Sequence, residues 1–157
     1  MNFLASNLVK KLIKKKITLS FAESCTGGLL SSTITAINNS SKIFKLGIVV
    51  YSNKSKINLL KVPKHILNSC GAVSEQVCYC LVKNLNKLTK TKISVSITGI
   101  AGPNGGSLNK PVGLVYIGIK KGNTIKVRKF KFKNKGRLYI QKSTVKKTLE
   151  LILNLIK

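Results

Sequence analysis

ITLSFAESCTGG, residues 17–28, carries the strongest indication of the fold class. Residues 17–22 are a short apolar run of the length and composition of a buried strand. A polar turn with two glycines follows, and a helical pattern runs from Thr26 to about Ile37. A buried strand that passes directly into a helix is typical of α/β domains, in which ligands gather at the carboxyl ends of the strands.

The same alternation extends in both directions from this stretch. Apolar periodicity predicts helices at residues 2–15, 53–60, 74–88 and 138–156, a helical turn after Pro63, and strands at 45–51, 93–98, 112–119 and 124–132. The last two strands form a hairpin around residues 121–123, and a Gly/Pro/Asn-rich loop, 99–111, precedes them. We therefore expect one domain, residues 1–157, with a three-layer α/β/α sandwich and a mixed β-sheet.

The chain is strongly basic, with 29 Lys and Arg against 3 Asp and Glu and a net charge of +26. Such a charge attracts polyanions. However, only Arg128 and Arg137 are arginines, and the lysines are spread along the whole chain with many Asn and Ile residues. A biased base composition explains that pattern better than a nucleic-acid partner does. We expect nucleic-acid binding to be at most non-specific.

Targeting signals and metal-binding patterns were not found in the sequence. No apolar run approaches the roughly 18 residues of a membrane span, and the N-terminus does not resemble a signal peptide, so we expect a cytoplasmic protein without membrane contact. The four cysteines are then expected to be free thiols. With His65 as the only histidine, we expect neither a metal site nor a cofactor.

Polar segments follow three of the predicted strands, at 22–28, 51–56 and 98–106. In the first, the hydroxyls of Ser24 and Thr26 and the N–H groups around Gly27 and Gly28 have the chemistry to hold an anion at a helix N-terminus. The alternative is that a hydroxyl only caps the helix and the glycines only allow close packing. Spacing alone leaves both interpretations open.

The available bases limit the possible hydrolytic chemistry. The chain has no aspartate, and its acids are Glu23, Glu75 and Glu150. A Ser–His–Asp triad cannot be assembled as such, and His65 is separated from the polar turns by Pro63. Lys56 lies one helical turn beyond a strand end, so its amine can reach back over that end. A lysine whose pKa is lowered is therefore the most available base for a serine nucleophile.

Five stretches in fixed order resemble the CinA C-terminal domain family. They are AESCTGG (22–28), VVYSNKSK (49–56), GAVSEQV (71–77), TGIAGPNGG (98–106) and KPVGLVYIGI (110–119). The resemblance extends roughly from Ile17 to Ile156. It implies a homodimeric amidohydrolase that takes a small-molecule substrate, nicotinamide mononucleotide, and converts it to nicotinate mononucleotide and ammonia.

The resemblance also implies site residues. Lys56 occupies the place of the lysine in a Ser–Lys dyad, and Ser24 and Ser41 both match motif positions. We favour Ser41 as nucleophile and place Ser24 near the substrate, although the sequence does not decide between them. Tyr51 is expected to relay or donate a proton. The expected substrate-binding residues are Glu23, which holds ribose hydroxyls or orients the lysine, and Thr26, Gly27, Gly28, Asn53, Thr98 and Arg137, the last pairing with phosphate.

Some positions depart from the family pattern. Asn104 replaces an aspartate, Asn39 replaces a glycine, and Leu46-Gly47 replaces a glycine pair. Two alternatives therefore accompany the amidase hypothesis. One is a basic competence-related or nucleic-acid-associated accessory protein, and the other is a nucleotide-binding domain that has lost turnover.

Overall fold

The computed structural model describes all residues from Met1 to Lys157, and its element order agrees with the predicted alternation. The elements are α1 (Asn2–Lys14), β1 (Leu19–Glu23), α2 (Leu29–Thr35), the 3-10 turn η1 (Ser40–Lys42), β2 (Phe44–Val49), α3 (Asn53–Leu60), α4 (Lys64–Cys70), α5 (Glu75–Thr89), β3 (Ile93–Gly99), β4 (Leu114–Lys121), β5 (Thr124–Lys131) and α6 (Arg137–Leu155). None of the helices is both long and apolar enough to cross a bilayer.

The five strands form one mixed sheet in the order β2-β1-β3-β4-β5. β1 is central to the parallel part, because it pairs in parallel with both β2 and β3. β4 and β5 are added as an antiparallel hairpin. The carboxyl ends of β1, β2 and β3 consequently meet at one edge of the sheet, and the connections that leave this edge are the segments able to form a site.

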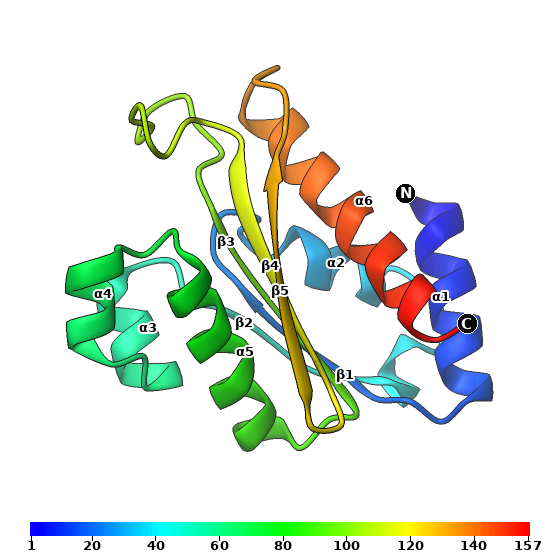
Figure 1. The fold of residues 1–157 in the computed structure, drawn as a ribbon. Coiled ribbons are helices and arrows are strands. Elements are labelled where there is room, and N and C mark those ends of the chain that lie inside the picture. The colour runs from blue at the N-terminus through cyan, green and yellow to red at the C-terminus, as the bar shows by residue number, and fades with distance from the viewer.

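Helices cover both faces of the sheet and confirm the predicted α/β/α sandwich (Figure 1). On one face, α1, α2 and α6 enclose a core of 22 buried residues that includes Phe21, Val95 and Ile117. On the other face, α3, α4 and α5 enclose a smaller core of 8 residues around Ala22 and Leu81. All five residues of β1 are buried, as expected for a strand covered from both sides.

The connection from β1 to α2 is held by the carboxylate of Glu23. Its two oxygens accept hydrogen bonds from the N–H groups of Gly28 (3.1 Å), Leu30 (3.0 Å) and Ser31 (2.7 Å) and from the Ser31 hydroxyl (2.7 Å). These are N–H groups that the first turn of a helix leaves without an intrahelical acceptor. Gly28 precedes the helix with φ of 95°, a conformation that side chains disfavour. α2 therefore begins at Leu29, three residues after the predicted start.

Candidate active site

Lys56 lies at the edge of the sheet because of the way α3 begins. Ser52 caps this helix, accepting a hydrogen bond from the N–H of Ser55, while the Ser55 hydroxyl accepts one from the N–H of Ser52. This reciprocal cap starts the helix just after β2 ends. Helical side chains lean toward the helix N-terminus, so the amine of Lys56, in the second turn, reaches back over the strand ends. The sequence predicted this direction.

The amine of Lys56 is enclosed by oxygen atoms and lacks an acidic partner. Its Nζ donates hydrogen bonds to the carbonyls of Val50 (2.8 Å) and Tyr51 (3.2 Å) and to Oγ of Ser24 (3.2 Å). The side chain is only 1% exposed. Burial disfavours the charged form, and the pKa of Lys56 is lowered below the usual value for lysine, although the nearby Cys25 thiol opposes the shift slightly. A buried amine of this kind is suited to act as a base.

Ser24 lies in the turn that follows β1 and is buried. Its carbonyl accepts a hydrogen bond from the N–H of Gly27, which has φ of 59°, so the chain folds tightly back toward α2. In the same turn, the backbone N–H of Thr26 takes part in no backbone hydrogen bond, and the N–H of Cys25 lies next to the Cys25 thiol. The hydroxyl of Ser24 thus faces a buried amine, and the N–H groups of the next two residues are outside the backbone hydrogen bonding of the helices and strands.

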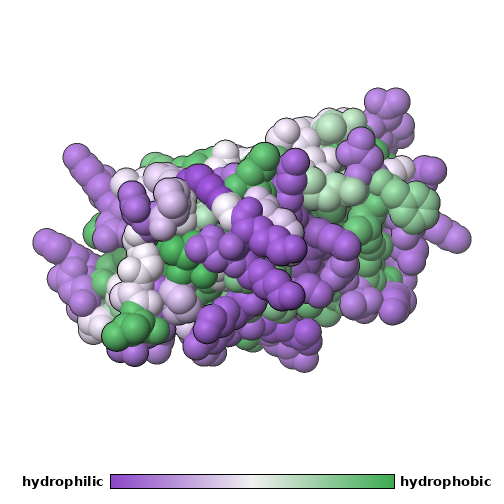
Figure 2. Space-filling view, turned by 90° about the horizontal axis from the view of Figure 1, so that it is seen from above, coloured by the Kyte–Doolittle hydropathy of each residue, from purple (hydrophilic) through white to green (hydrophobic).

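A cavity of about 230 Å³ opens above this pair, at the carboxyl edge of the sheet. Ser24, Lys56 and Thr98 lie on its strand side, and the loop after β3 supplies much of the opposite wall. Figure 2, which looks at the molecule from above the view of Figure 1, shows mainly hydrophilic side chains over this end, with hydrophobic patches between them. Three polar segments that are distant in sequence therefore converge on one cavity.

Arg137 and Tyr51 form the rim of the cavity. Arg137 is the first residue of α6, and its guanidinium donates to the carbonyl of Gly102 (2.9 Å) and to the Tyr51 hydroxyl (2.7 Å). The Tyr51 side chain is 58% exposed, and no contact joins its hydroxyl to Ser24 or Lys56. Arg137 thus presents a fixed positive charge at the mouth of the cavity, whereas the sequence expectation that Tyr51 transfers protons stays a prediction.

The other expected binding residues have different surroundings. Thr98 lines the cavity, and its hydroxyl donates to the carbonyl of Ala72 (2.8 Å). Asn53 is exposed, begins α3 and does not line the cavity. Gly27 and Gly28 shape the turn through their positive φ angles. Thr26 is buried, and its hydroxyl is the one buried side-chain polar atom of the protein without a hydrogen-bond partner.

The structure does not bring Ser41 to Lys56, which corrects our preference for Ser41 as nucleophile. Ser41 lies in η1 before β2 begins, whereas Lys56 follows the end of β2. The two residues therefore lie beyond opposite ends of a six-residue strand, and strands rise about 3.3 Å per residue, so roughly 20 Å separates those ends. Ser41 is exposed and does not line the cavity. Ser24 is the serine at the amine.

Glu23 also has a different role from the expected one. Its carboxylate is fully buried and accepts four hydrogen bonds from the start of α2. No ion pair joins it to Lys56, and it does not line the cavity. Both parts of the expectation, orienting the lysine and holding ribose hydroxyls, are therefore wrong. The residue holds α2 in place and leaves the lysine amine without a carboxylate neighbour.

Sequence reasoning missed two residues at the turn that follows β1 and carries Ser24. Cys25 lines the cavity beside Ser24, and burial raises the pKa of its thiol to about 12, so the thiol stays protonated at neutral pH and does not compete as a nucleophile. Gln141 donates from Nε2 to the carbonyl of Cys25 (2.8 Å). It follows Arg137 by one helical turn, a spacing that could have indicated a shared face.

Fold and site together define a small α/β domain with a buried Ser–Lys pair at the carboxyl edge of a mixed sheet. A sequence profile of the CinA C-terminal domain matches residues 1–156. The chain belongs to the CinA C-terminal domain family.

Relatives and solved structures agree with this assignment. A CinA-like protein of Prochlorococcus marinus subsp. pastoris (strain CCMP1986 / NIES-2087 / MED4) is 46% identical over 144 residues, which are 90% of this chain and 33% of that protein. The chain spans about a third of the length of the curated relatives that it matches. The competence/damage inducible protein CihA from Agrobacterium tumefaciens superposes with a TM-score of 0.96 at 34% identity, covering 99% of this chain and 95% of its own. A CinA superfamily protein from Escherichia coli gives 0.92 at 29% identity, covering 97% and 88%.

Proposed function

We propose that the chain is an amidohydrolase that converts nicotinamide mononucleotide to nicotinate mononucleotide and ammonia, with Ser24 as nucleophile and Lys56 as base. The observation that carries the chemistry is the 3.2 Å hydrogen bond between Lys56 Nζ and Ser24 Oγ at a cavity floor. The resemblance to the CinA C-terminal domain family supplies the substrate.

The contacts of Lys56 suit proton abstraction from Ser24. As a neutral amine, Lys56 keeps two N–H bonds, which the carbonyls of Val50 and Tyr51 accept. The remaining position on nitrogen is then a lone pair directed at the Ser24 hydroxyl. Lys56 takes the proton as Oγ attacks the carboxamide carbon, and the carbonyl π electrons move to oxygen to form a tetrahedral oxyanion. The N–H groups of Cys25 and Thr26, which follow Ser24 in the same turn, are our candidate donors to that oxyanion.

Collapse of the tetrahedral intermediate releases ammonia, and hydrolysis of the resulting acyl-enzyme then completes the reaction. The C–N bond breaks as the ammonium of Lys56 returns its proton to the leaving nitrogen, which departs as ammonia and leaves an acyl ester on Ser24. Neutral Lys56 then takes a proton from water, whose oxygen attacks the ester. The C–Oγ bond breaks, Ser24 regains a proton, and the nicotinate carboxylate is released. The Cys25 thiol stays protonated, and Tyr51 and Arg137 lie at the rim of the cavity, so the Lys56 amine serves both half-reactions.

Ammonia release tests the proposal directly. We expect the wild-type chain to release one ammonia for each nicotinamide mononucleotide consumed, measured by a coupled glutamate dehydrogenase assay and by chromatography of the nucleotide product. Calorimetric binding of the nucleotide with no ammonia would instead favour the nucleotide-binding domain that has lost turnover. The absence of both binding and ammonia at high protein concentration would refute the proposed substrate.

Arg137 is expected to bind the substrate phosphate. Its guanidinium lies at the cavity mouth, and a planar fork of donors suits a phosphate. We predict that Arg137→Gln raises KM for nicotinamide mononucleotide by about tenfold or more, the scale of a lost charge-assisted hydrogen bond, and leaves kcat nearly unchanged. Nicotinamide riboside, which has no phosphate, should show similar kinetics with both proteins. An equal KM increase for both substrates would contradict a phosphate contact.

A further inference from the structure

A second cavity, of about 250 Å³, lies away from the Ser–Lys site, between the β4–β5 hairpin and the end of α6. We call it the hairpin hollow. Three cross-strand pairs form its sheet side, namely Ile117 with Arg128, Ile119 with Lys126, and Lys121 with Thr124, and Leu151 and Leu155 of α6 form the opposite side. Residues spaced by two along each strand share a face, so all six strand side chains belong to the face that α6 covers.

The hollow exists because α6 does not extend over the edge strand. Ile117 is fully buried, but Thr124, Lys126 and Arg128 are all exposed. Leu155 is 37% exposed. An apolar floor therefore remains accessible beside β5, and exposed apolar surface of this kind is often a binding site. At the far end, Lys121 Nζ donates to the Leu155 carbonyl (3.0 Å) and joins the hairpin to α6.

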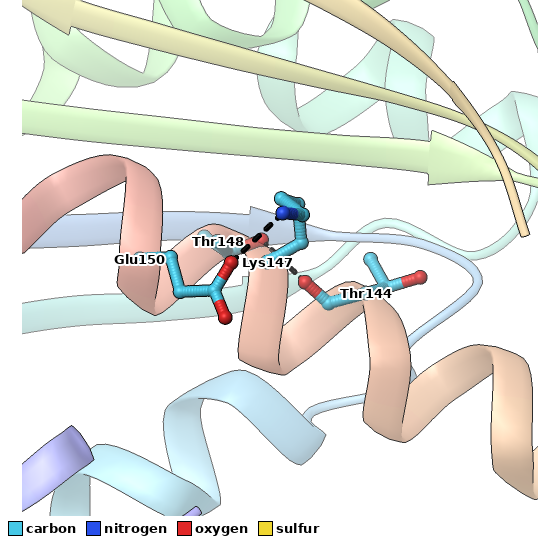
Figure 3. A network of polar contacts seen from close by, with 4 residues as sticks. All are labelled: Thr144, Lys147, Thr148 and Glu150. Atoms are coloured by element: carbon cyan, nitrogen blue, oxygen red, sulfur yellow. Dashed lines mark hydrogen bonds and ion pairs between the residues drawn. The ribbon is translucent and has the colours of Figure 1, made fainter. Parts of the chain in front are cut away.

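The positive charges at the open side of the hollow have no counterion in the protein. The only ion pair joins Lys147 to Glu150 at 2.8 Å on α6, in the contact network of Figure 3. Neither acid that remains, buried Glu23 or Glu75 at the start of α5, lines the hollow. Arg128 is also one of only two arginines in a chain of 29 basic residues, and the other, Arg137, lines the active-site cavity.

We propose that the hairpin hollow binds a small amphiphilic anion, a carboxylate or phosphate group attached to a short apolar body. The apolar body would lie on the floor formed by Ile119, Leu151 and Leu155, and the anionic group would pair with Arg128 and Lys126 at the opening. A guanidinium fork next to an ammonium suits either group. A second copy of the chain is disfavoured as the occupant because it offers few anionic groups to this basic edge: Glu23 is buried, and Glu150 is paired with Lys147.

Isothermal titration calorimetry of the full chain with decanoate tests this site. Acetate supplies the anionic group alone and decanol supplies the apolar body alone, so we expect decanoate to bind at least about tenfold more tightly than either. The double variant K126Q/R128Q should weaken decanoate binding by about tenfold or more, and L155S should weaken it as well. All three altered side chains are exposed, so these proteins should remain folded.

Lys129→Gln is the matched control, because Lys129 is an exposed cation on the same strand, and its odd-numbered position places it on the opposite face, paired with Tyr116. It should leave decanoate binding unchanged. Decanoate affinity that is undetectable, equal to that of decanol, or unaffected by K126Q/R128Q would overturn the proposal. Two results would point to a different occupant and would also overturn the proposal, provided that K126Q/R128Q leaves decanoate binding unchanged. One is that the wild-type chain binds oligothymidylate and K126Q/R128Q does not. The other is that the wild-type chain sediments as a dimer and K126Q/R128Q as a monomer.

Discussion

Ser24→Ala is expected to lower kcat for ammonia release from nicotinamide mononucleotide by about 10⁴-fold or more, because loss of a nucleophile that acts together with its base removes the covalent pathway. The substrate should still bind, since Arg137 and the cavity walls remain in place. Single-turnover kinetics should also show no acyl-enzyme in this variant, whereas mass spectrometry of quenched wild-type protein should detect one.

Ser41→Ala is the matched control for this experiment. Ser41 is exposed and lies before β2, at the opposite edge of the sheet from Lys56. Its replacement should change kcat by less than about twofold, as for most surface substitutions. If Ser41→Ala were inactive and Ser24→Ala were active, the assignment of the nucleophile made from the structure would be wrong.

Lys56→Met is expected to lower kcat by about 10³-fold, within the range for loss of a general base. The acid limb of the wild-type pH profile should report the lowered pKa of Lys56, so kcat/KM rises with pH as the ammonium loses its proton. The residual kcat/KM of Lys56→Met should lack this acid limb. Lys54→Met, at an exposed position on the same helix, should keep both the rate and the limb.

Stability provides a second measurement on Lys56. The pKa of Lys56 is lowered by burial in the folded chain and is about 10.4 in the unfolded chain. Between these two pKa values the unfolded chain binds more protons than the folded chain, so Lys56 makes the free energy of unfolding rise with pH. Below the folded-state pKa the buried amine is charged in the folded chain, and the free energy of unfolding gains nothing from the neutral amine. The Tm of wild type relative to Lys56→Met should therefore increase as the pH rises from the lowered folded-state pKa of Lys56 toward its ordinary value. A pH-independent difference would indicate that the buried amine keeps an ordinary pKa.

The sequence predicted the architecture well because local patterns encode it. Alternating apolar runs indicated the strands, α5 begins directly after its cap Ser74, where the predicted helix starts, and the hairpin turns near Gly122, within the predicted turn. The direction of Lys56 also followed from local geometry, since a side chain in the second turn of a helix leans back toward the strand that precedes it.

The choice of serine failed because motif matching ignored strand direction. A residue before a strand and a residue after it lie at opposite edges of a parallel sheet, so Ser41 and Lys56 could not meet once β2 was placed between them. The role of Glu23 required the tertiary structure, because a buried carboxylate satisfies whichever donors surround it, and those turned out to be the first N–H groups of α2.

By itself, the sequence determined which segments become helices and strands and which end of each strand carries polar chemistry, because these properties depend on neighbours in the chain. Only the tertiary structure decided which side chains meet. Arg137 contacts Tyr51 across 86 positions, and the hairpin hollow depends on where α6 ends above β5. Such contacts depend on how the layers pack against one another, which no local pattern specifies.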